Sequence, residues 1–173
     1  MKFGDFCTYC AAMMGTDTWP RQCPACKQFM YRNPTPVGVG VIPIIRNDVP
    51  GRPYGLLVIR RDIEPEKGKL ALPGGFMELG ETWEQAIARE TDEETGGGVM
   101  LEPTGIKPFH VETATNGNLL IFGIAAHYPY EAIRFRPNNE VQEWDVLWRP
   151  EQLAFPTHTK VAEHFFELFA PAA

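Results

Sequence analysis

The sequence predicts an α/β fold in which a mixed sheet lies between two helices, preceded by a small cysteine-rich segment. Two helical patterns, at 82–95 and from about residue 158, alternate with β-branched runs that are typical of strands. All four cysteines lie within the first 26 residues, ahead of the first such run. We therefore expect a cysteine segment over residues 1–33 and an α/β/α sandwich over residues 34–173.

Composition and charge limit the classes of function. Of the 173 residues 44% are hydrophobic, enough to bury the core of one domain, and the formal net charge is −6. This acidity disfavours a nucleic-acid or membrane partner, so a phosphate-bearing substrate would need a cation to neutralise it. The opening residues lack the features of a signal peptide, and no run of about 18 apolar residues could span a bilayer. We expect a cytoplasmic protein.

The strands are predicted in the following order. Residues 37–45 (VGVGVIPII) are apolar and β-branched. Pro43 cannot donate to a ladder, which predicts an edge or a bulge there. A loop is expected at 47–53 and a second strand at 54–62. Further strands are expected around 105–111, 119–127 and 141–148.

The two helices carry different signals. Thr82 and Gln85 have the spacing of a capping box, and Gly96 supplies a C-terminal stop. The last helix is amphipathic from about His158, which we expect to be structural or exposed. The apolar side of this helix is predicted to hold Val161, Ala162, Phe165, Leu168 and Phe169.

The helix at 82–95 has acids on its apolar side. At about 100° per residue, Trp83, Ala86 and Ile87 point the same way as Glu90, Glu93 and Glu94. Three acids at this spacing repel one another near the helix C-terminus, where negative charge is unfavourable. A hard cation such as Mg²⁺ would offset that repulsion. The alternative is a charge run on a solvated helix, and helical geometry alone does not decide between the two.

The spacing around this helix resembles the Nudix box, G-x5-E-x7-R-E-U-x-E-E-x-G-U, in which U is a bulky aliphatic residue. All seven fixed positions are matched, by Gly75, Glu81, Arg89, Glu90, Glu93, Glu94 and Gly96. Both U positions depart from the pattern, since Thr91 and Gly97 stand there. These departures put local packing in doubt more than chemistry.

The resemblance implies roles for individual residues. Glu90, Glu93 and Glu94 match glutamates that bind Mg²⁺ or Mn²⁺ and make up the catalytic set with Arg89, which would orient one of them by an ion pair. Glu81 matches the loop glutamate that supports the metal site. The implied activity is hydrolysis of a diphosphate linkage in a nucleotide.

Candidate residues outside the helix are less well specified. Gly74 and Gly75 would let the backbone approach a phosphate. Arg60 or Arg61 would contact the diphosphate, the alternative being a solvated charge at a strand end. A downstream carboxylate, Glu143 in preference to Glu140, would act as base or extra ligand, the alternative being that both are merely exposed.

The cysteines have the spacing Cys7-x2-Cys10-x12-Cys23-x2-Cys26. Two such pairs complete a tetrahedral Zn²⁺ site with no open position, which would stabilise a segment too small for its own core. Disulfides or idle thiols are the alternative. A nucleic-acid-binding ribbon is a further interpretation, which the acidity of the chain and the basic residues Arg21, Lys27 and Arg32 do not favour.

A cysteine ribbon leading through residues 31–34 (YRNP) into a Nudix box resembles the zinc-ribbon branch of the Nudix hydrolases. Residues 153–157 (LAFPT) resemble the FAD diphosphatases of that branch, and the S-Q-P-W-W signature of NADH pyrophosphatases is missing. The resemblance implies a small nucleotide substrate of the FAD, ADP-ribose or NADH type and a homodimer. The alternatives are hydrolysis of nucleoside triphosphates, processing of RNA 5′ ends, and a nucleotide sensor without catalysis, which the intact acids disfavour.

Overall fold

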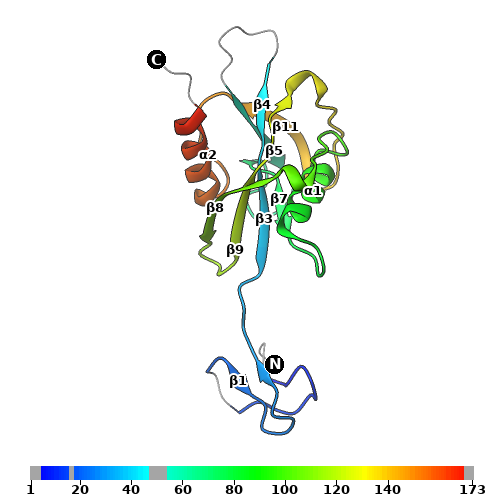
Figure 1. Ribbon diagram of the computed structural model, residues 1–173, viewed down its shortest axis with the longest axis vertical. Coiled ribbons are helices and arrows are strands. Elements are labelled where there is room, and N and C mark those ends of the chain that lie inside the picture. The colour runs from blue at the N-terminus through cyan, green and yellow to red at the C-terminus, as the bar shows by residue number, and fades with distance from the viewer. Residues whose placement is uncertain (1–4, 16–17, 47–53, 170–173) are drawn as a thin grey trace. The chain divides into compact units, whose positions relative to one another are not determined.

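Figure 1 shows the computed structural model of the chain, which describes residues 5–15, 18–46 and 54–169. The chain divides into two compact units, residues 1–34 and residues 35–173. The loop expected at 47–53 lies outside the described residues. Among those residues, none of the helices is long and apolar enough to cross a membrane.

The smaller unit, here called the cysteine unit, is built on one short hairpin. Strands β1 (Arg21–Gln22) and β2 (Phe29–Met30) pair antiparallel, and a single bridge joins Phe6 to Met13. Its buried core consists of Cys7, Met14, Cys23 and Met30. Two of these four side chains are cysteines, so the unit depends on its thiols for its interior.

The larger unit contains two sheets. In the five-stranded sheet the order is β10 (Tyr128–Pro129), β4 (Pro43–Ile45), β5 (Gly55–Arg61) and β11 (Val141–Leu147), with β6 (Leu70–Ala71) also paired to β5. In the four-stranded sheet the order is β7 (Gly74–Phe76), β3 (Pro36–Val41), β9 (Leu119–Ile124) and β8 (Lys107–Thr113). Each sheet has one parallel pair, β10 with β4 and β3 with β9. Two short 3-10 helices, Pro103–Gly105 and Tyr130–Ala132, lie in the connections.

The expected single strand over residues 37–45 is wrong. The chain leaves the four-stranded sheet after Val41, and Pro43 opens β4 in the five-stranded sheet. The first position of a strand tolerates proline, which has no N–H to give to a ladder. Strand β4 lies between β10 and β5, so Pro43 marks a change of sheet and not an edge.

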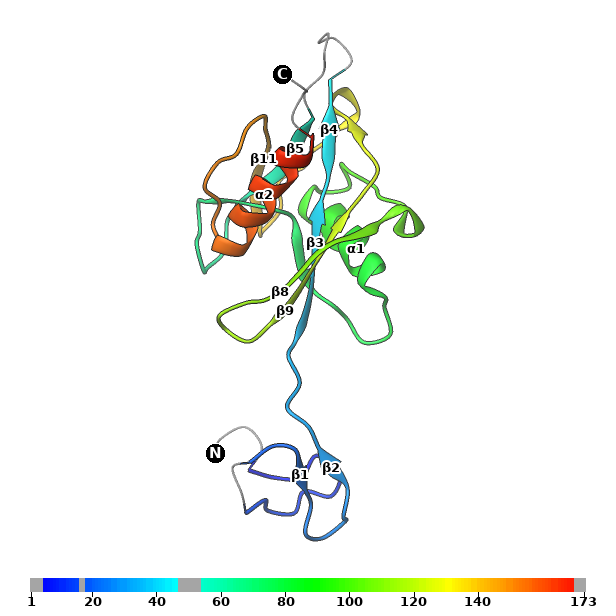
Figure 2. The same cartoon turned by 60° about the vertical axis from the view of Figure 1, so that its left-hand side comes forward.

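The two helices of the larger unit lie on opposite sides of its strands (Figure 1, Figure 2), and the mixed α/β sandwich expected from the sequence is confirmed. Helix α1 (Trp83–Glu94) starts at the predicted capping box, in which Thr82 and Gln85 bond to each other's backbone N–H. Helix α2 (Pro156–Phe169) starts two residues earlier than expected. Its apolar side includes Phe166, whereas the expected Leu168 is 58% exposed in the last turn.

Strand β3 determines how closely α1 packs, because its two faces differ. Val39 and Val41 point into the core beneath α2. Gly38 and Gly40 face α1: a Cβ on Gly38 would lie 3.0 Å from Cγ1 of Ile87, and one on Gly40 would lie 3.2 Å from Oγ1 of Thr91. The alternation along one strand therefore leaves room for the carboxylate helix to pack directly against the glycines of the sheet.

His158 anchors α2 from inside the core. Its Nδ1 accepts a hydrogen bond of 3.2 Å from the backbone N–H of Leu72, and its ring packs edge-on against Phe122 and Phe155. Burial lowers the pKa of His158 from 6.5 to about 3. The imidazole is therefore neutral, with its proton on Nε2.

Acidification should destabilise the protein through His158. Between about pH 6.5 and pH 3 the unfolded chain binds a proton that the folded chain does not, so the free energy of unfolding falls as pH falls. His158→Asn, which keeps an acceptor for Leu72, removes this dependence. Urea unfolding at pH 7, 6 and 5 should show the wild type losing about 1 kcal/mol more per pH unit than this variant. The control His164→Asn, whose imidazole is 49% exposed, should follow the wild-type profile; equal slopes for His158→Asn and wild type would contradict the prediction.

Candidate active site and cysteine cluster

Arg89 is the hub of the carboxylate cluster on α1. Its Nε donates to Glu81 Oε2 at 3.1 Å and its Nη2 donates to Glu81 Oε1 at 2.9 Å, a two-point contact between helix and loop. Nη2 also donates to the carbonyl of Phe76 at 2.9 Å. Hydrogen bonding from Arg89 lowers the pKa of Glu81, which therefore stays ionised.

The same guanidinium reaches two of the acids on its own helix. Its Nη1 donates to Glu90 Oε1 at 2.8 Å and to Glu93 Oε2 at 3.2 Å. The sequence led us to expect one ion pair at Arg89, and the structure has ion pairs with three acids. A guanidinium can do this because its five N–H groups point outward in a fixed plane.

Glu94 faces the sheet and is buried. Its Oε2 accepts a hydrogen bond of 2.8 Å from the backbone N–H of Gly74 in β7. Burial raises its pKa to about 8, and burial also raises the pKa of Glu90. Glu93 remains 59% exposed. Two of the three acids are thus withdrawn from water, as their place on the apolar side of α1 predicts.

The glycines of β7 make room for these carboxylates. A Cβ on Gly75 would lie 2.4 Å from the carboxylate of Glu90, and one on Gly74 would lie 2.3 Å from the carbonyl oxygen of Gly38. Close packing therefore explains why both positions are glycine. Their expected approach to a phosphate stays a prediction.

The remaining candidate residues lie on β5 and on the segment that leads into β11. Glu143 is the cross-strand neighbour of Arg60, and its Oε1 lies 2.5 Å from Arg60 Nε. Arg61 donates to the carbonyl of Pro65 at 3.0 Å and stacks 5.2 Å from the ring of Phe155. The negative charge of Glu140 contributes to raising the pKa of both Glu90 and Glu94. Glu140 therefore acts on the buried acids, whereas Glu143 is held by Arg60.

The acid cluster suits a hard divalent cation. Its donors are carboxylate oxygens, and like charge and burial leave Glu94 without full compensation. The oxygens of three acids do not come together within 4.8 Å in the described part of the chain. Mg²⁺ does not require this, because it commonly binds one or two carboxylates and fills its other positions with water and phosphate oxygens.

The cysteine unit brings its four thiols together. Their sulfur atoms all lie within 4.8 Å of one another, with Cys7 and Cys26 3.7 Å apart and Cys10 and Cys23 3.6 Å apart. All four are free thiols, so the disulfide alternative is wrong for this structure. A tetrahedral zinc site with Zn–S bonds of about 2.3 Å places sulfurs about 3.8 Å apart, so the cluster could hold zinc.

In each cysteine pair a backbone N–H is directed at the sulfur of the first cysteine. The backbone N–H of Tyr9 points at Cys7 Sγ and that of Cys26 points at Cys23 Sγ, both at 3.4 Å. The hydrogen bond from Cys26 is the main reason why the pKa of Cys23 falls to about 6. A thiolate is the form that binds a metal.

The profile of the NUDIX domain family matches residues 34–169. The chain belongs to the Nudix family. Among solved structures, a NUDIX hydrolase from Nitrosomonas europaea superposes with a TM-score of 0.70 at 24% identity, covering 94% of this chain and 90% of its own. That likeness concerns the fold.

Two curated relatives share parts of the sequence. An ADP-ribose pyrophosphatase from Methanocaldococcus jannaschii is 58% identical over 41 residues, which are 24% of each chain. An NAD-capped RNA hydrolase from Schizosaccharomyces pombe is 30% identical over 129 residues, 66% of this chain and 33% of its own. The matched regions span about a quarter to a third of the length of these relatives.

One of the two departures from the Nudix box, Gly97, has a local explanation, and Thr91 has none. Gly97 N–H donates to Asp92 O at 2.8 Å and Gly96 N–H donates to Glu93 O at 3.0 Å, a Schellman end for α1. Both glycines have positive φ, 63° and 78°, which an aliphatic side chain rarely adopts. Thr91 is fully buried beside Gly40, and its Oγ1 has no hydrogen-bond partner among the described residues.

Thr91→Val should stabilise the protein by about 1 kcal/mol, because a buried hydroxyl without a partner is replaced by a methyl group of the same shape. Thr95→Val is the matched control: this equally buried hydroxyl donates to Thr91 O at 2.7 Å and accepts from Val99 N–H at 3.0 Å, so its loss should destabilise by ~1–3 kcal/mol. Urea unfolding measures both. Destabilisation by Thr91→Val would show that the hydroxyl has a partner in solution.

Proposed function

We propose that the chain is a metal-dependent pyrophosphohydrolase that cleaves the diphosphate linkage of a dinucleotide or nucleoside-diphosphate derivative into two phosphomonoesters. One observation carries the proposal: Arg89 ties Glu81, Glu90 and Glu93 into one cluster while Glu94 is buried beside them against Gly74. Three of the acids share a single arginine, and the fourth is buried with one backbone N–H as its hydrogen-bond donor among the described residues, so negative charge is left to be neutralised. A site for a cation and a diphosphate explains all of them.

Glu90, Glu93 and Glu94 would hold Mg²⁺ or Mn²⁺, with Glu81 supporting them through Arg89. When bound, the ion supplies neutralisation of the diphosphate charge and a lowered pKa for water. Ionisation of Glu94 against its raised pKa would then be offset by the cation.

The protein's own groups would position the reaction. Arg89 fixes the carboxylates before substrate arrives, which lowers the cost of assembling the site. Arg60 and Arg61 would contact the phosphates, for which Arg60 would first leave Glu143. We propose Glu140 as the downstream base or extra ligand in place of Glu143, because its charge acts on Glu90 and Glu94.

FAD, ADP-ribose and NADH are the proposed substrate types. The LAFPT segment at 153–157 and the cysteine unit support FAD, and the relative from Methanocaldococcus jannaschii supports ADP-ribose. A second candidate is removal of an NAD cap from RNA, supported by the names of several curated relatives. Both reactions break the same diphosphate linkage, so the acid cluster serves either.

The purified protein with Mg²⁺ should turn over FAD, ADP-ribose or NADH faster than dGTP, read as monophosphate released. Glu94→Gln should lower kcat by at least ~10²-fold, because the amide keeps the acceptor for Gly74 N–H but loses the charge that would hold a cation. Glu84→Gln, on the first turn of the same helix, is the control and should retain activity.

Full activity of Glu94→Gln would contradict the proposed metal site. If dGTP led by tenfold in kcat/KM, about 1.4 kcal/mol of differential transition-state binding, triphosphate hydrolysis would replace the dinucleotide proposal.

We also propose that the four cysteines hold one structural Zn²⁺ per chain. Elemental analysis of the purified protein should find that stoichiometry. Cys23→Ser should lower both zinc content and the Tm of the cysteine unit, since binding free energy becomes folding free energy. Absence of zinc from protein prepared without chelators would refute the assignment.

A further inference from the structure

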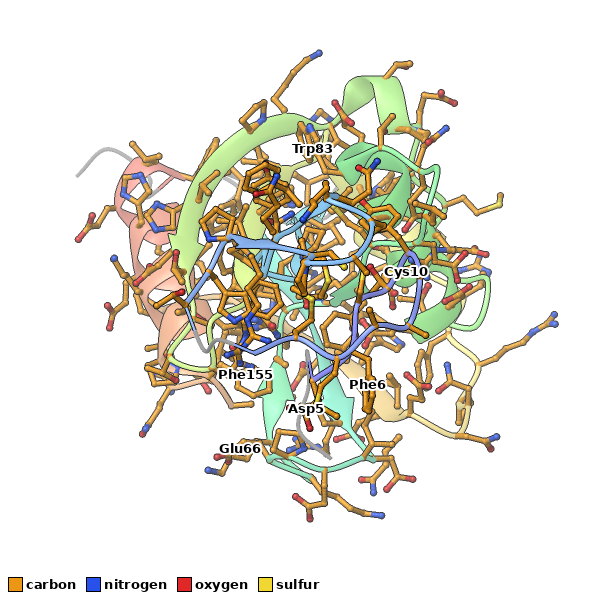
Figure 3. All side chains as sticks on the ribbon, turned by 90° about the horizontal axis from the view of Figure 1, so that it is seen from below. Asp5, Phe6, Cys10, Glu66, Trp83 and Phe155 are labelled. Atoms are coloured by element: carbon orange, nitrogen blue, oxygen red, sulfur yellow. The ribbon has the colours of Figure 1, made fainter. Side chains whose placement is uncertain are left out.

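The segment that leads into β11 is hydrogen-bonded to the C-terminal end of α1. The backbone N–H of Arg134 donates to Gly98 O and that of Arg136 donates to Thr95 O, both at 3.2 Å. A Cβ on Gly98 would lie 2.2 Å from the carbonyl oxygen of Arg134, so the two stretches of backbone are in direct contact. Figure 1 and Figure 3 show this segment, yellow to pale orange, on the side of the larger unit that carries α1, and Trp83 in Figure 3 marks the first turn of that helix. The end of the helix that carries the acid cluster therefore sets the position of the segment.

Asn138 continues this contact with its side chain. Its Nδ2 donates to the backbone carbonyl of Glu93 at 2.6 Å, in the last turn of α1. Its Oδ1 accepts from the backbone N–H of Glu140 at 2.8 Å and from that of Val141 at 2.9 Å. The backbone N–H of Asn138 also donates to Val141 O at 3.2 Å. One exposed amide thus uses both of its polar atoms to join α1 to the turn that carries Glu140.

The backbone of Glu140 is held from its other side by the end of β5. Its carbonyl oxygen accepts from the backbone N–H of Asp62 at 2.7 Å, directly after β5. Asp62 is itself fixed, because Gln142 Nε2 donates to its Oδ1 at 2.7 Å and Lys67 Nζ lies 2.8 Å from the same oxygen. Both backbone polar groups of Glu140 therefore have partners, although its side chain is exposed. A backbone fixed in this way leaves the carboxylate only its rotamers.

Glu140 acts on the acid cluster through its charge. That charge contributes to raising the pKa of Glu90 and of Glu94, although no hydrogen bond or ion pair joins the three carboxylates among the described residues. An acid on a connecting segment keeps its distance from a helix only where the two are linked. The Asn138 amide is such a link, and asparagine suits it because one short side chain carries a donor and an acceptor.

We propose that Asn138 is a positioning residue, which joins the turn at Glu140 to the end of α1 and so places the Glu140 carboxylate beside the acid cluster. The inference rests on the proposed function, in which Glu140 is the downstream base or extra ligand. Asn138 itself touches neither substrate nor metal. A displacement of about 1 Å can cost about two orders of magnitude in rate, so this link matters more for catalysis than for stability.

Amide hydrogen exchange measures the link without metal or turnover. In Asn138→Ala the backbone N–H groups of Glu140 and Val141 should exchange at least about tenfold faster, because both lose their acceptor. Exchange in the rest of the larger unit should stay as in the wild type. Asn138→Ser separates the two halves of the link. Its hydroxyl oxygen can still accept from Glu140 N–H, but it has no donor that reaches Glu93 O.

The kcat for the nucleotides and the affinity for Mn²⁺, measured by the spin resonance of the free ion, show whether the link serves Glu140. Glu140→Gln should lower at least one of these quantities about tenfold or more, and Asn138→Ala and Asn138→Ser should each lower the same one. Asn138→Ala added to Glu140→Gln should change it by no more than about twofold, because no carboxylate is left to place. Asn139→Ala is the matched control. This neighbouring exposed side chain makes no hydrogen bond among the described residues, so every readout should equal that of the wild type.

The proposal is overturned if Asn138→Ala has the same effect on kcat or Mn²⁺ affinity with and without Glu140→Gln, since the loss would then be general. It is also overturned if Glu140→Gln changes neither quantity, or if Asn138→Ala changes amide exchange alone. A wild type that binds Mn²⁺ but hydrolyses none of the nucleotides would contradict the proposed function, and the comparison of Mn²⁺ affinities would still test Asn138. A wild type that neither binds Mn²⁺ nor hydrolyses a nucleotide would overturn both.

Discussion

The close approach of α1 to the sheet is the constraint on which the site depends. Four glycines allow it: Gly38 and Gly40 of β3, Gly75 of β7 and Gly123 of β9, where a Cβ would lie 2.7 Å from Cδ1 of Ile87. Each glycine weakens its strand by roughly 0.5–1 kcal/mol relative to alanine. In return the helix lies low enough for Glu94 to reach the backbone of Gly74 and for Glu90 to occupy the space above Gly75. With side chains at these positions, α1 would stand off and its acids would face water.

This approach creates an electrostatic imbalance that Arg89 only partly corrects. The guanidinium contacts Glu81, Glu90 and Glu93, but Glu94 faces the opposite way, toward β7. Burial outweighs the opposing effects of the Gly74 N–H and the charge of Arg61, and the pKa of Glu94 rises to about 8. The end of α1 adds unpaired carbonyls of the same sign, of which Glu93 O is taken by Asn138 Nδ2 at 2.6 Å and by Gly96 N–H. A cation at this end of the helix would offset both the charge of the buried Glu94 carboxylate and the negative end of the helix dipole.

Much of this arrangement could be predicted from sequence because it depends on local spacing. The capping box at Thr82, the acids on one side of α1 and the stop at Gly96 are set by helical periodicity, which residue types report directly. What sequence could not show depends on pairing between distant segments. From its sequence, the apolar run at 37–45 is predicted as one strand. It divides between two sheets because residues 36–41 pair with β9, whereas residues 43–44 pair with β5. Likewise, only the register of β11 on β5 shows that Glu143 faces Arg60.

Selectivity for the groups beside the diphosphate cannot come from the acid cluster alone. A cation held by carboxylates responds to the diphosphate and is indifferent to the groups on either side of it, so selectivity has to come from surfaces outside the box. Residues 35–173 carry a formal charge of −8, the difference between −6 for the chain and +2 for residues 1–34, and would repel a polyanion. Residues 1–34 carry +2 only while their thiols are neutral, because four thiolates around one Zn²⁺ would bring the formal charge of the unit to zero. The contrast in charge between the two units therefore depends on the state of the four cysteines, and the acidic larger unit leaves neutralisation of a diphosphate to a bound cation.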